Sequence, residues 1–184
     1  MLFIASVASA APVTKVTGPY KVSFDLNTTL NYTNIIAKPI ETPTSFTYKM
    51  LIKTNNSTFA QVAIYESKNL TDSTMDVGKL LVEKDIINLG YFNNISLANL
   101  VIDKMKGFIF TGLNARKARI FQAYYWIDSI DCQCGPVSVG KTEVEVISSY
   151  PLNETKNLLF SLHVEKTKST EKPKVLTFLP PKSS

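Results

Sequence analysis

The stretch Ala-Arg-Ile-Phe-Gln-Ala-Tyr-Tyr-Trp-Ile-Asp, residues 118–128, carries the strongest β-strand pattern in the chain. Its alternate residues divide into two mostly apolar faces, one formed by Phe121, Ala123, Tyr125 and Ile127, the other by Ile120, Gln122, Tyr124 and Trp126. A strand that is apolar on both faces is typical of the interior of a sheet, where both faces are covered. The stretch therefore predicts a central strand around which the other segments are arranged.

Several other segments show the same period of two and predict further strands. Residues 20–26 place Val22, Phe24 and Leu26 on one face. Residues 46–52 and 59–65 flank a polar turn and predict a hairpin. Residues 97–102 and 106–113 follow, and residues 141–150 complete the set. In this last segment the inward face is Val144, Val146 and Ser148, and the opposite face is Glu143, Glu145 and Ile147.

Two segments follow a helical period. A stripe of Val77, Leu80, Leu81 and Ile87 predicts one helix, with Asp72 or Thr74 as its N-cap and Gly90 as its stop. Residues 152–162 predict a closing helix, although the alternation of residues 158–164 also fits a strand. Consecutive strands with short turns and two helices predict an α+β fold, with a mainly antiparallel sheet flanked by helices.

The charge distribution separates a domain from a tail. The net charge is +5, but residues 166–184 alone carry five Lys and one Glu, so the rest of the chain is almost neutral. A nearly neutral domain lacks the basic face that nucleic-acid binding requires. We expect a signal peptide over residues 1–10, truncated relative to typical ones, a single α+β domain over 11–166, and a flexible basic tail with prolines over 167–184.

The N-terminus resembles an export signal. Residues 2–7 are apolar, and small residues at Ala8 and Ala10 fit the pockets of signal peptidase, which predicts cleavage between Ala10 and Ala11. The alternative is an apolar N-terminal strand. No later stretch reaches the roughly 18–20 apolar residues of a membrane span, so no span is expected in the mature chain.

Glycosylation sequons point in the same direction. Asn-x-Ser/Thr triplets have meaning only in an exported chain, where they are glycosylated on exposed loops. Seven occur, at Asn27, Asn31, Asn55, Asn56, Asn69, Asn94 and Asn153. The sequence therefore predicts an extracytoplasmic protein, secreted or held at the cell surface, and a glycoprotein.

Parts of the chain resemble the PsbP-like family, whose members are exported or lumenal α/β/α sandwich domains. The resemblance covers roughly residues 18–166 and lies in Gly18–Phe24, in Lys106–Phe108 leading into Ala118–Asp128, and in Val144–Pro151 followed by Leu158–Leu162. It implies a scaffold that binds partners or stabilises an assembly, usually without catalysis. No position matches a binding motif of the family, so it supplies no site residue.

The two cysteines form the main local cluster of reactive groups, Cys132-Gln-Cys134, between Asp131 and Gly135. Three interpretations stay open: a structural turn with oxidised or buried cysteines, a strained redox-active disulfide, or a soft-metal site. The lone His163 lies far away in sequence, which disfavours zinc. No metal site and no cofactor is predicted.

Catalytic patterns are weak. His163 is the single histidine and is interpreted as a partly exposed structural residue. The carboxylate pairs Asp128/Asp131 and Glu143/Glu145 are possible acid and base groups, but a solvated strand edge is the simpler interpretation of the glutamates. Gly140-Lys-Thr142 lacks the spacing of a phosphate loop. Tyr124, Tyr125 and Trp126 could form a ligand platform, although aromatic residues in a central strand usually belong to the core.

Together these observations predict a non-catalytic binding or assembly module of the cell envelope, with an unidentified protein partner and with the oligomeric state open. Two alternatives remain. One is a thiol redox or metal-binding protein that uses Cys132 and Cys134. The other is a structural glycoprotein of the cell surface.

Overall fold

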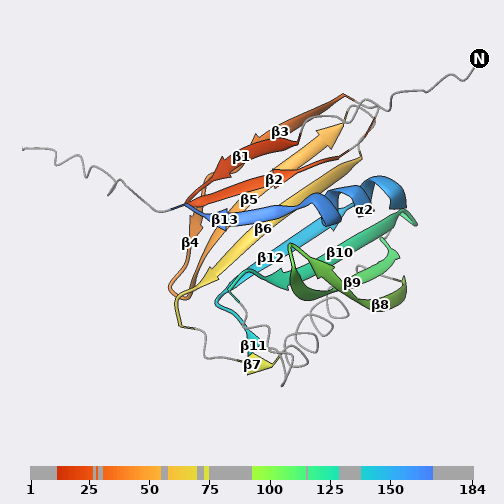
Figure 1. Ribbon diagram of the computed structural model, residues 1–184. Helices are drawn as coiled ribbons and strands as arrows, with labels where there is room; N and C mark the ends of the chain where they lie inside the picture. Colours follow the sequence, from red (N-terminus) through yellow and green to blue (C-terminus); the bar gives the residue numbers. More distant parts are fainter. Residues whose placement is uncertain are drawn as a thin grey trace, which may run out of the picture.

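The computed structural model describes residues 12–26, 28, 31–54, 58–69, 73–74, 93–114, 116–128 and 138–167. Two packed sheets account for most of these residues (Figure 1). The smaller sheet has three strands in the order β1-β2-β13, namely β1 (Val13–Thr17), β2 (Tyr20–Phe24) and β13 (His163–Lys166). A separate short ladder joins β7 (Ser73–Thr74) to β11 (Ser138–Val139).

The larger sheet has eight strands and follows the order β3-β5-β6-β12-β10-β9-β8, with β4 paired to β5 off this path. All the pairings between described strands are antiparallel. Its strands are β3 (Tyr32–Ile36), β4 (Ile40–Glu41), β5 (Ser45–Thr54), β6 (Phe59–Ser67), β8 (Asn93–Ile102), β9 (Met105–Leu113), β10 (Arg119–Trp126) and β12 (Thr142–Ser148).

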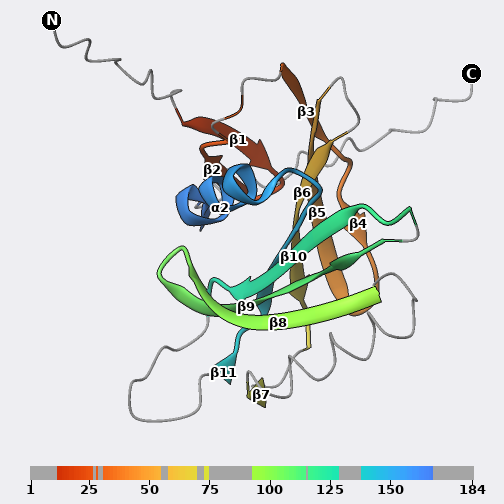
Figure 2. The same ribbon diagram turned by 90° about the vertical axis from the view of Figure 1, so that its right-hand side faces the viewer.

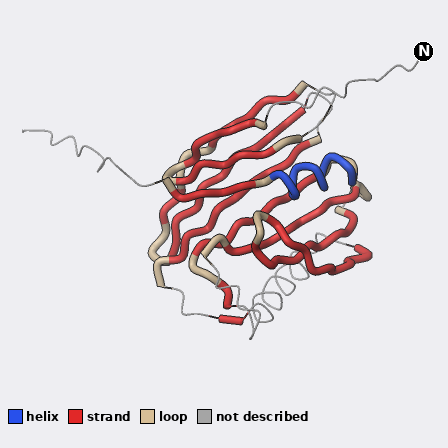
Figure 3. Tube along the Cα trace, in the orientation of Figure 1, coloured by secondary structure: helices blue, strands red, loops and turns tan. Residues whose placement is uncertain are grey.

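The expected α+β sandwich, a sheet flanked by helices, is wrong. The described chain is β-rich, and its one helix is the ten-residue α2 (Leu152–Ser161), as the colouring of Figure 3 makes plain. Residues 20–26 were expected in the main sheet, but β2 forms a second sheet whose apolar face packs on the first. The helix expected around Val77–Ile87 lies outside the described residues, and Thr74, its proposed cap, pairs in β7.

Several local predictions are confirmed. The hairpin forms from β5 and β6, and β10 lies between β12 and β9 with both faces buried. On β12, Val144, Val146 and Ser148 are buried toward the core, as the alternation predicted. The closing segment is helical from Leu152 to Ser161, so the helix prediction is confirmed and the strand alternative is wrong over residues 158–161. A short strand, β13, begins only at His163.

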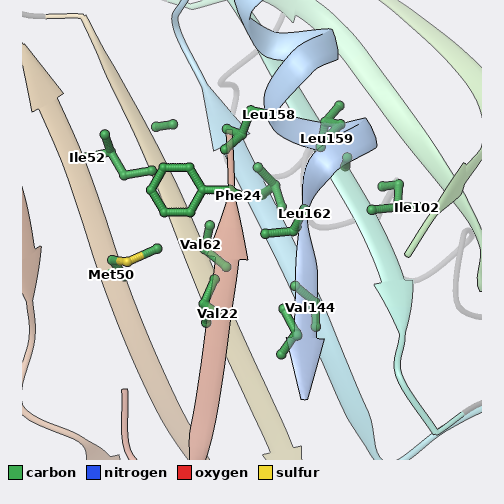
Figure 4. Close-up of a cluster of buried hydrophobic side chains, with 14 of the residues drawn as sticks. Val22, Phe24, Met50, Ile52, Val62, Ile102, Val144, Leu158, Leu159 and Leu162 are labelled. Atoms are coloured by element: carbon green, nitrogen blue, oxygen red, sulfur yellow. The ribbon is translucent and has the colours of Figure 1, made fainter. Parts of the chain in front are cut away.

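The main core lies between the two sheets and beneath α2. Figure 4 shows side chains of β2, β5, β6, β12 and α2 converging on this space. Its most deeply buried members are fully shielded from solvent, among them Val22, Phe24, Met50, Ile52, Ile64, Val144 and Leu158. In Figure 2, α2 and the smaller sheet lie on one side of the curved β8–β9–β10 region. The opposite side of the large sheet is called here the outer face.

The turn between β1 and β2 requires glycine. Gly18 has a φ of 58°, a left-handed conformation that residues with a Cβ resist. A Cβ at this position would also overlap the ring of Tyr48, which packs against the turn from β5. The turn can therefore lie directly on the large sheet, and this contact holds the two layers together at one end.

Within the described residues, no helix combines the length and the apolar composition needed to cross a bilayer. The expectation that the chain has no membrane-spanning helix holds over that part of it. The ten residues of α2 fall well short of the roughly 20 that a spanning helix needs.

The helix offers a matched test of this core. Leu158 is fully buried, whereas Phe160, two residues further along α2, is 63% exposed. We expect Leu158→Ala to lower the free energy of unfolding by about 2–5 kcal/mol, because it removes buried methyl groups and leaves a cavity. Phe160→Ala should change it by less than about 0.5 kcal/mol. Urea denaturation of both variants measures the difference, and equal losses would contradict this packing.

Candidate functional site

Two acidic residues of β12 meet a group of aromatic side chains on the outer face. We call this group the acid–aromatic cluster and define it as Glu143 and Glu145 of β12, Tyr65 of β6, and Gln122, Tyr124 and Trp126 of β10. The register of the sheet brings them together: Glu143 lies opposite both Trp126 and Tyr65, and Glu145 lies opposite Tyr124. Both neighbouring strands therefore present aromatic rings to the same two carboxylates.

Glu145 is 8% exposed and is held entirely by neutral donors. Its Oε1 accepts hydrogen bonds from Gln122 Nε2 at 2.6 Å and from the hydroxyl of Tyr124 at 3.0 Å. Its Oε2 accepts one from the hydroxyl of Tyr65 at 3.0 Å, and Gln122 Nε2 also donates to the Tyr124 hydroxyl. The opposite neighbour in the β6 register is the small Ala63, which leaves room for Tyr65 to reach across.

Glu143 has a different environment. It is partly buried, and its side chain forms no hydrogen bond or ion pair with the rest of the described chain. Burial, reinforced by the negative charge of Glu145, raises the pKa of Glu143 to about 7 from an ordinary value of 4.5. The two carboxylates of β12 therefore differ. Glu145 is held by hydrogen-bond donors, whereas the raised pKa of Glu143 lets it gain or lose a proton near neutral pH.

The tyrosines act as fixed donors. Burial, with the nearby charge of Glu145, raises the pKa of both Tyr65 and Tyr124 well above the ordinary value of 10. Both hydroxyls therefore keep their protons throughout the physiological range. The negative charge of Glu145 is spread over three hydrogen bonds, but no positive charge in the cluster neutralises it.

An aromatic wall supports one side of the cluster. Phe108 of β9 stacks on Tyr124 with ring centroids 5.4 Å apart, and its centroid lies 6.0 Å from that of Trp126. Trp126 and Tyr124 are only 2% and 5% exposed. These buried rings form a rigid apolar boundary on one side of the two carboxylates.

The structure corrects the expectation that Glu143 and Glu145 mark a solvated strand edge. The strand that carries them is interior, between β6 and β10, and Glu145 is buried while Glu143 is partly buried. The suggested platform is also divided, because Tyr124 and Trp126 face this cluster while Tyr125 faces the core. Sequence reasoning missed Tyr65 and Gln122 as members, since nothing along the chain indicates that β6 pairs with β12.

Of the carboxylate pair Asp128/Asp131, the structure describes only Asp128. Asp128 accepts hydrogen bonds from the backbone N–H groups of Lys141 and Thr142, at 3.1 and 3.0 Å. These N–H groups belong to the Gly-Lys-Thr segment, which lacks the spacing of a phosphate loop, and their hydrogen bonds are already accepted by the Asp128 carboxylate. Asp128 is therefore a structural residue that fixes the start of β12. Asp131 lies outside the described residues.

His163 joins two distant elements. Its Nδ1 lies 2.6 Å from Asp103 Oδ1, and the other oxygen of Asp103 accepts the backbone N–H of Val164 at 2.9 Å. Asp103 and Lys104 form the left-handed turn between β8 and β9, with φ values of 51° and 66°. The imidazole is about half exposed. This geometry describes a clamp that ties β13 to the β8–β9 turn.

Of the predicted glycosylation, cysteine and cleavage sites, only some lie among the described residues. Three sequon residues, Asn31, Asn69 and Asn153, are exposed. The side chain of Asn94, at the start of β8, is not described. Lying outside the described residues are Cys132, Cys134, Ala10, Ala11, Asn27, Asn55 and Asn56. Among the described residues there is no group of three or more His, Cys, Asp or Glu side chains arranged to hold a metal ion.

No protein-family model, no curated protein and no solved structure matches this chain. The chemistry of the site must therefore be inferred from its own groups. Glu143 can hold a positive charge or exchange a proton near neutral pH. Because Glu143 and Glu145 extend from one strand to the same side, they meet a ligand from one direction, unlike an acid and base pair that flanks a bond. This arrangement favours holding a cation.

The acidic pair makes stability depend on pH. Glu143 binds its proton more tightly in the folded chain than in the unfolded one, so the free energy of unfolding should fall as the pH rises from about 4.5 to 7. Glu143→Gln removes this charge and should raise the free energy of unfolding by about 1–3 kcal/mol at pH 8. At pH 4.5 the same substitution should change the free energy of unfolding little.

Urea denaturation of both proteins at the two pH values measures the effect. Glu154→Gln, in the first turn of α2, is the control, because this carboxylate lies on a different element and its removal should not reproduce the gain. If the free energy of unfolding changes by the same amount between pH 4.5 and 7 in the wild type and in Glu143→Gln, the assignment is contradicted.

Proposed function

We propose that this chain is a non-catalytic binding module that works outside the cytoplasm, and that the acid–aromatic cluster holds a positively charged group of its ligand. One observation carries the proposal. Glu143 is a partly buried carboxylate with no described partner, placed beside a second carboxylate whose charge is likewise not neutralised within the cluster.

The chemistry of the cluster suits an amine or guanidinium group. A cation beside Glu143 would supply the charge that the neutral donors of Glu145 do not, and aromatic rings attract cations through their electron-rich faces. Tyr65 already has an ammonium group over its ring, since Nζ of Lys49 lies 5.8 Å from the ring centroid. A metal ion would instead call for a closer set of oxygen ligands than Glu143 and a saturated Glu145 provide.

Export is supported by the sequence and is compatible with the surface. The apolar start with small residues at Ala8 and Ala10 favours cleavage before Ala11. Asn31, Asn69 and Asn153 are exposed, as glycan acceptors must be. Binding without catalysis is also what the resemblance to PsbP-like proteins implies, and that resemblance stays a prediction. The redox or metal role of Cys132 and Cys134 and the role as a structural surface glycoprotein remain the alternative predictions.

The single tryptophan provides a direct assay. Trp126 is the only tryptophan of the chain and lies opposite Glu143 in the sheet. We expect methylguanidinium or butylamine to change its fluorescence in a saturable way. Binding should weaken as the pH falls below about 7, by up to tenfold per unit, because protonation of Glu143 removes the charge that attracts the cation.

Variants separate the site from the rest of the surface. Glu143→Gln should weaken binding at pH 8 by at least tenfold, which corresponds to about 1.4 kcal/mol. Glu154→Gln, on α2, should leave it unchanged. The proposed site is wrong if Glu143→Gln binds both probes as tightly as the wild type, or if neither probe gives a saturable signal at pH 8.

The sequon at Asn153 tests export and its timing. Asn153 is exposed in the first turn of α2, but the hydroxyl of Thr155 is buried and hydrogen bonded to Ser148 Oγ at 2.8 Å and the carbonyl of Tyr150 at 3.1 Å. An enzyme that reads this hydroxyl can reach it only before folding. The comparison sequon is Asn31, whose Thr33 is exposed.

Peptide mass spectrometry of protein from its native source measures the occupancy of both sites. We expect a glycan at Asn31, and a glycan at Asn153 only if modification precedes folding. A native chain that begins at Met1 and carries no glycan at either asparagine would contradict the extracytoplasmic assignment.

A further inference from the structure

A second site lies at the far end of the large sheet, away from α2. A shallow pocket of about 160 Å³ is lined by residues of β8, β9 and β10 near the β9–β10 turn. Figure 2 shows this turn on the right. Its lining residues are Ser96, Thr111, Gly112, Leu113 and Arg119. The acid–aromatic cluster does not include any of them.

The strand register builds this pocket. Ser96 of β8 lies opposite Thr111 of β9, and Leu113 of β9 lies opposite Arg119 of β10. The hydroxyls of Ser96 and Thr111 are 2.5 Å apart and share one hydrogen bond. Each hydroxyl has one hydrogen to donate, so this pair keeps one hydrogen for a ligand acceptor. The pocket is thus lined by two hydroxyl residues, on β8 and β9, and by Arg119 of β10.

Both arginines of the chain lie close to this pocket in the sequence. The chain has 18 lysines and only two arginines, and both arginines, Arg116 and Arg119, belong to the β9–β10 hairpin. No Asp or Glu occurs between Lys104 and Ile127. Arginine presents a rigid fork of donors that matches the oxygens of carboxylate, phosphate and sulfate groups, which lysine does not.

The three cationic side chains at this turn have no charged partner among the described residues. Arg116, Lys117 and Arg119 are exposed, and their side chains form no ion pair or hydrogen bond with the described residues. The turn itself is held by Asn114, whose Oδ1 accepts the backbone N–H groups of Arg116 and Ala118 at 2.9 and 3.0 Å. This turn therefore does not need the cationic side chains for its own structure.

Lys117 occupies a position where glycine would be easier. Its φ is 58°, the left-handed conformation that costs a residue with a Cβ roughly 1–2 kcal/mol. In three-residue hairpin turns this left-handed position is usually glycine. The Lys117 side chain is exposed, so its charge adds to the positive potential around the turn.

We propose that this pocket binds an oxyanion group, a phosphate, sulfate or carboxylate, carried by a second ligand or by another part of the same ligand. Arg119 takes two of the oxygens with its fork, and the Ser96–Thr111 hydroxyl pair donates to the anion. Arg116 and Lys117 attract it from the adjacent turn. A volume of about 160 Å³ admits the anionic group but not the body of a large molecule, so the rest of the ligand lies outside.

The test is a titration of the full chain with sodium phosphate, sodium sulfate and sodium acetate, followed by ¹H–¹⁵N NMR at constant ionic strength. We expect saturable shifts of the backbone amides of Thr111, Gly112 and Leu113. Arg119→Gln should weaken binding at least tenfold, and Lys117→Gln by about two- to threefold, with the second effect fading as salt rises. Lys15→Gln on the exposed β1 is the matched control and should have no effect.

A sulfated oligosaccharide such as a heparin hexasaccharide forms the second arm. Tighter binding than inorganic sulfate, lost in Arg119→Gln, identifies an anion carried on a polymer, whereas equal affinity identifies a small free anion. Shifts that fail to saturate, or that are the same in Arg119→Gln, overturn the proposal. Because Arg119 is exposed, the variant should keep the thermal stability of the wild type. It should also keep the cation response of Trp126, so the two sites are tested independently.

Discussion

The register of β12 is the constraint on which the site depends. β12 lies between β6 and β10, and its inward residues Val144, Val146 and Ser148 are fixed by the core. Side chains alternate along a strand, so Glu143 and Glu145 must point to the outer face. A slip of one residue would bury both acids in the apolar core, at a cost that no partner there could offset. The glutamates are therefore held in place by the residues between them.

Burying two like charges in one place has to be compensated, and the sheet compensates only one of them. Glu145 receives three hydrogen bonds from neutral donors on the two adjacent strands. A hydrogen bond to a charged group stabilises more than one between neutral groups, which is why this carboxylate can be almost fully buried. Glu143 receives none from the described chain. Because Glu143 is only partly buried, its carboxylate is the member of the pair that a ligand group can reach.

The last two described elements, α2 and β13, join the two sheets. The helix α2 covers the core, and β13 then pairs with β2, about 140 residues earlier in the sequence. Ser161 Oγ accepts the backbone N–H of Asp25 at 2.7 Å, and Lys21 pairs with Glu165 at 2.8 Å. The clamp between His163 and Asp103 fastens the same strand to the β8–β9 turn. The single histidine is thus used for closure, and contacts this distant in sequence slow folding because a long loop must close first.

Local pattern was enough to predict most of the strands and the closing helix, because periods of two and 3.6 reflect burial of one face. It could not show that Val22 and Phe24 belong to a second sheet, since a strand has the same alternation in either layer. It also could not distinguish a buried Glu143 from a solvated one, because the difference comes from Tyr65 and Trp126, brought near only by pairing. The same limit applies to His163 and Asp103, which are 60 residues apart.

Strand β10 determines how the two charged sites relate to one another. Arg119 is its first residue and Trp126 its last, so the oxyanion pocket and the acid–aromatic cluster lie at opposite ends of one strand. Seven steps of about 3.3 Å separate these two residues by roughly 23 Å. Charges near the surface are screened over about 8 Å at physiological ionic strength, so neither site neutralises the other. A nearly neutral domain can in this way keep a carboxylate on β12 and a guanidinium on the neighbouring β10, neither with an ion-pair partner among the described residues, and each able to attract a group of opposite charge.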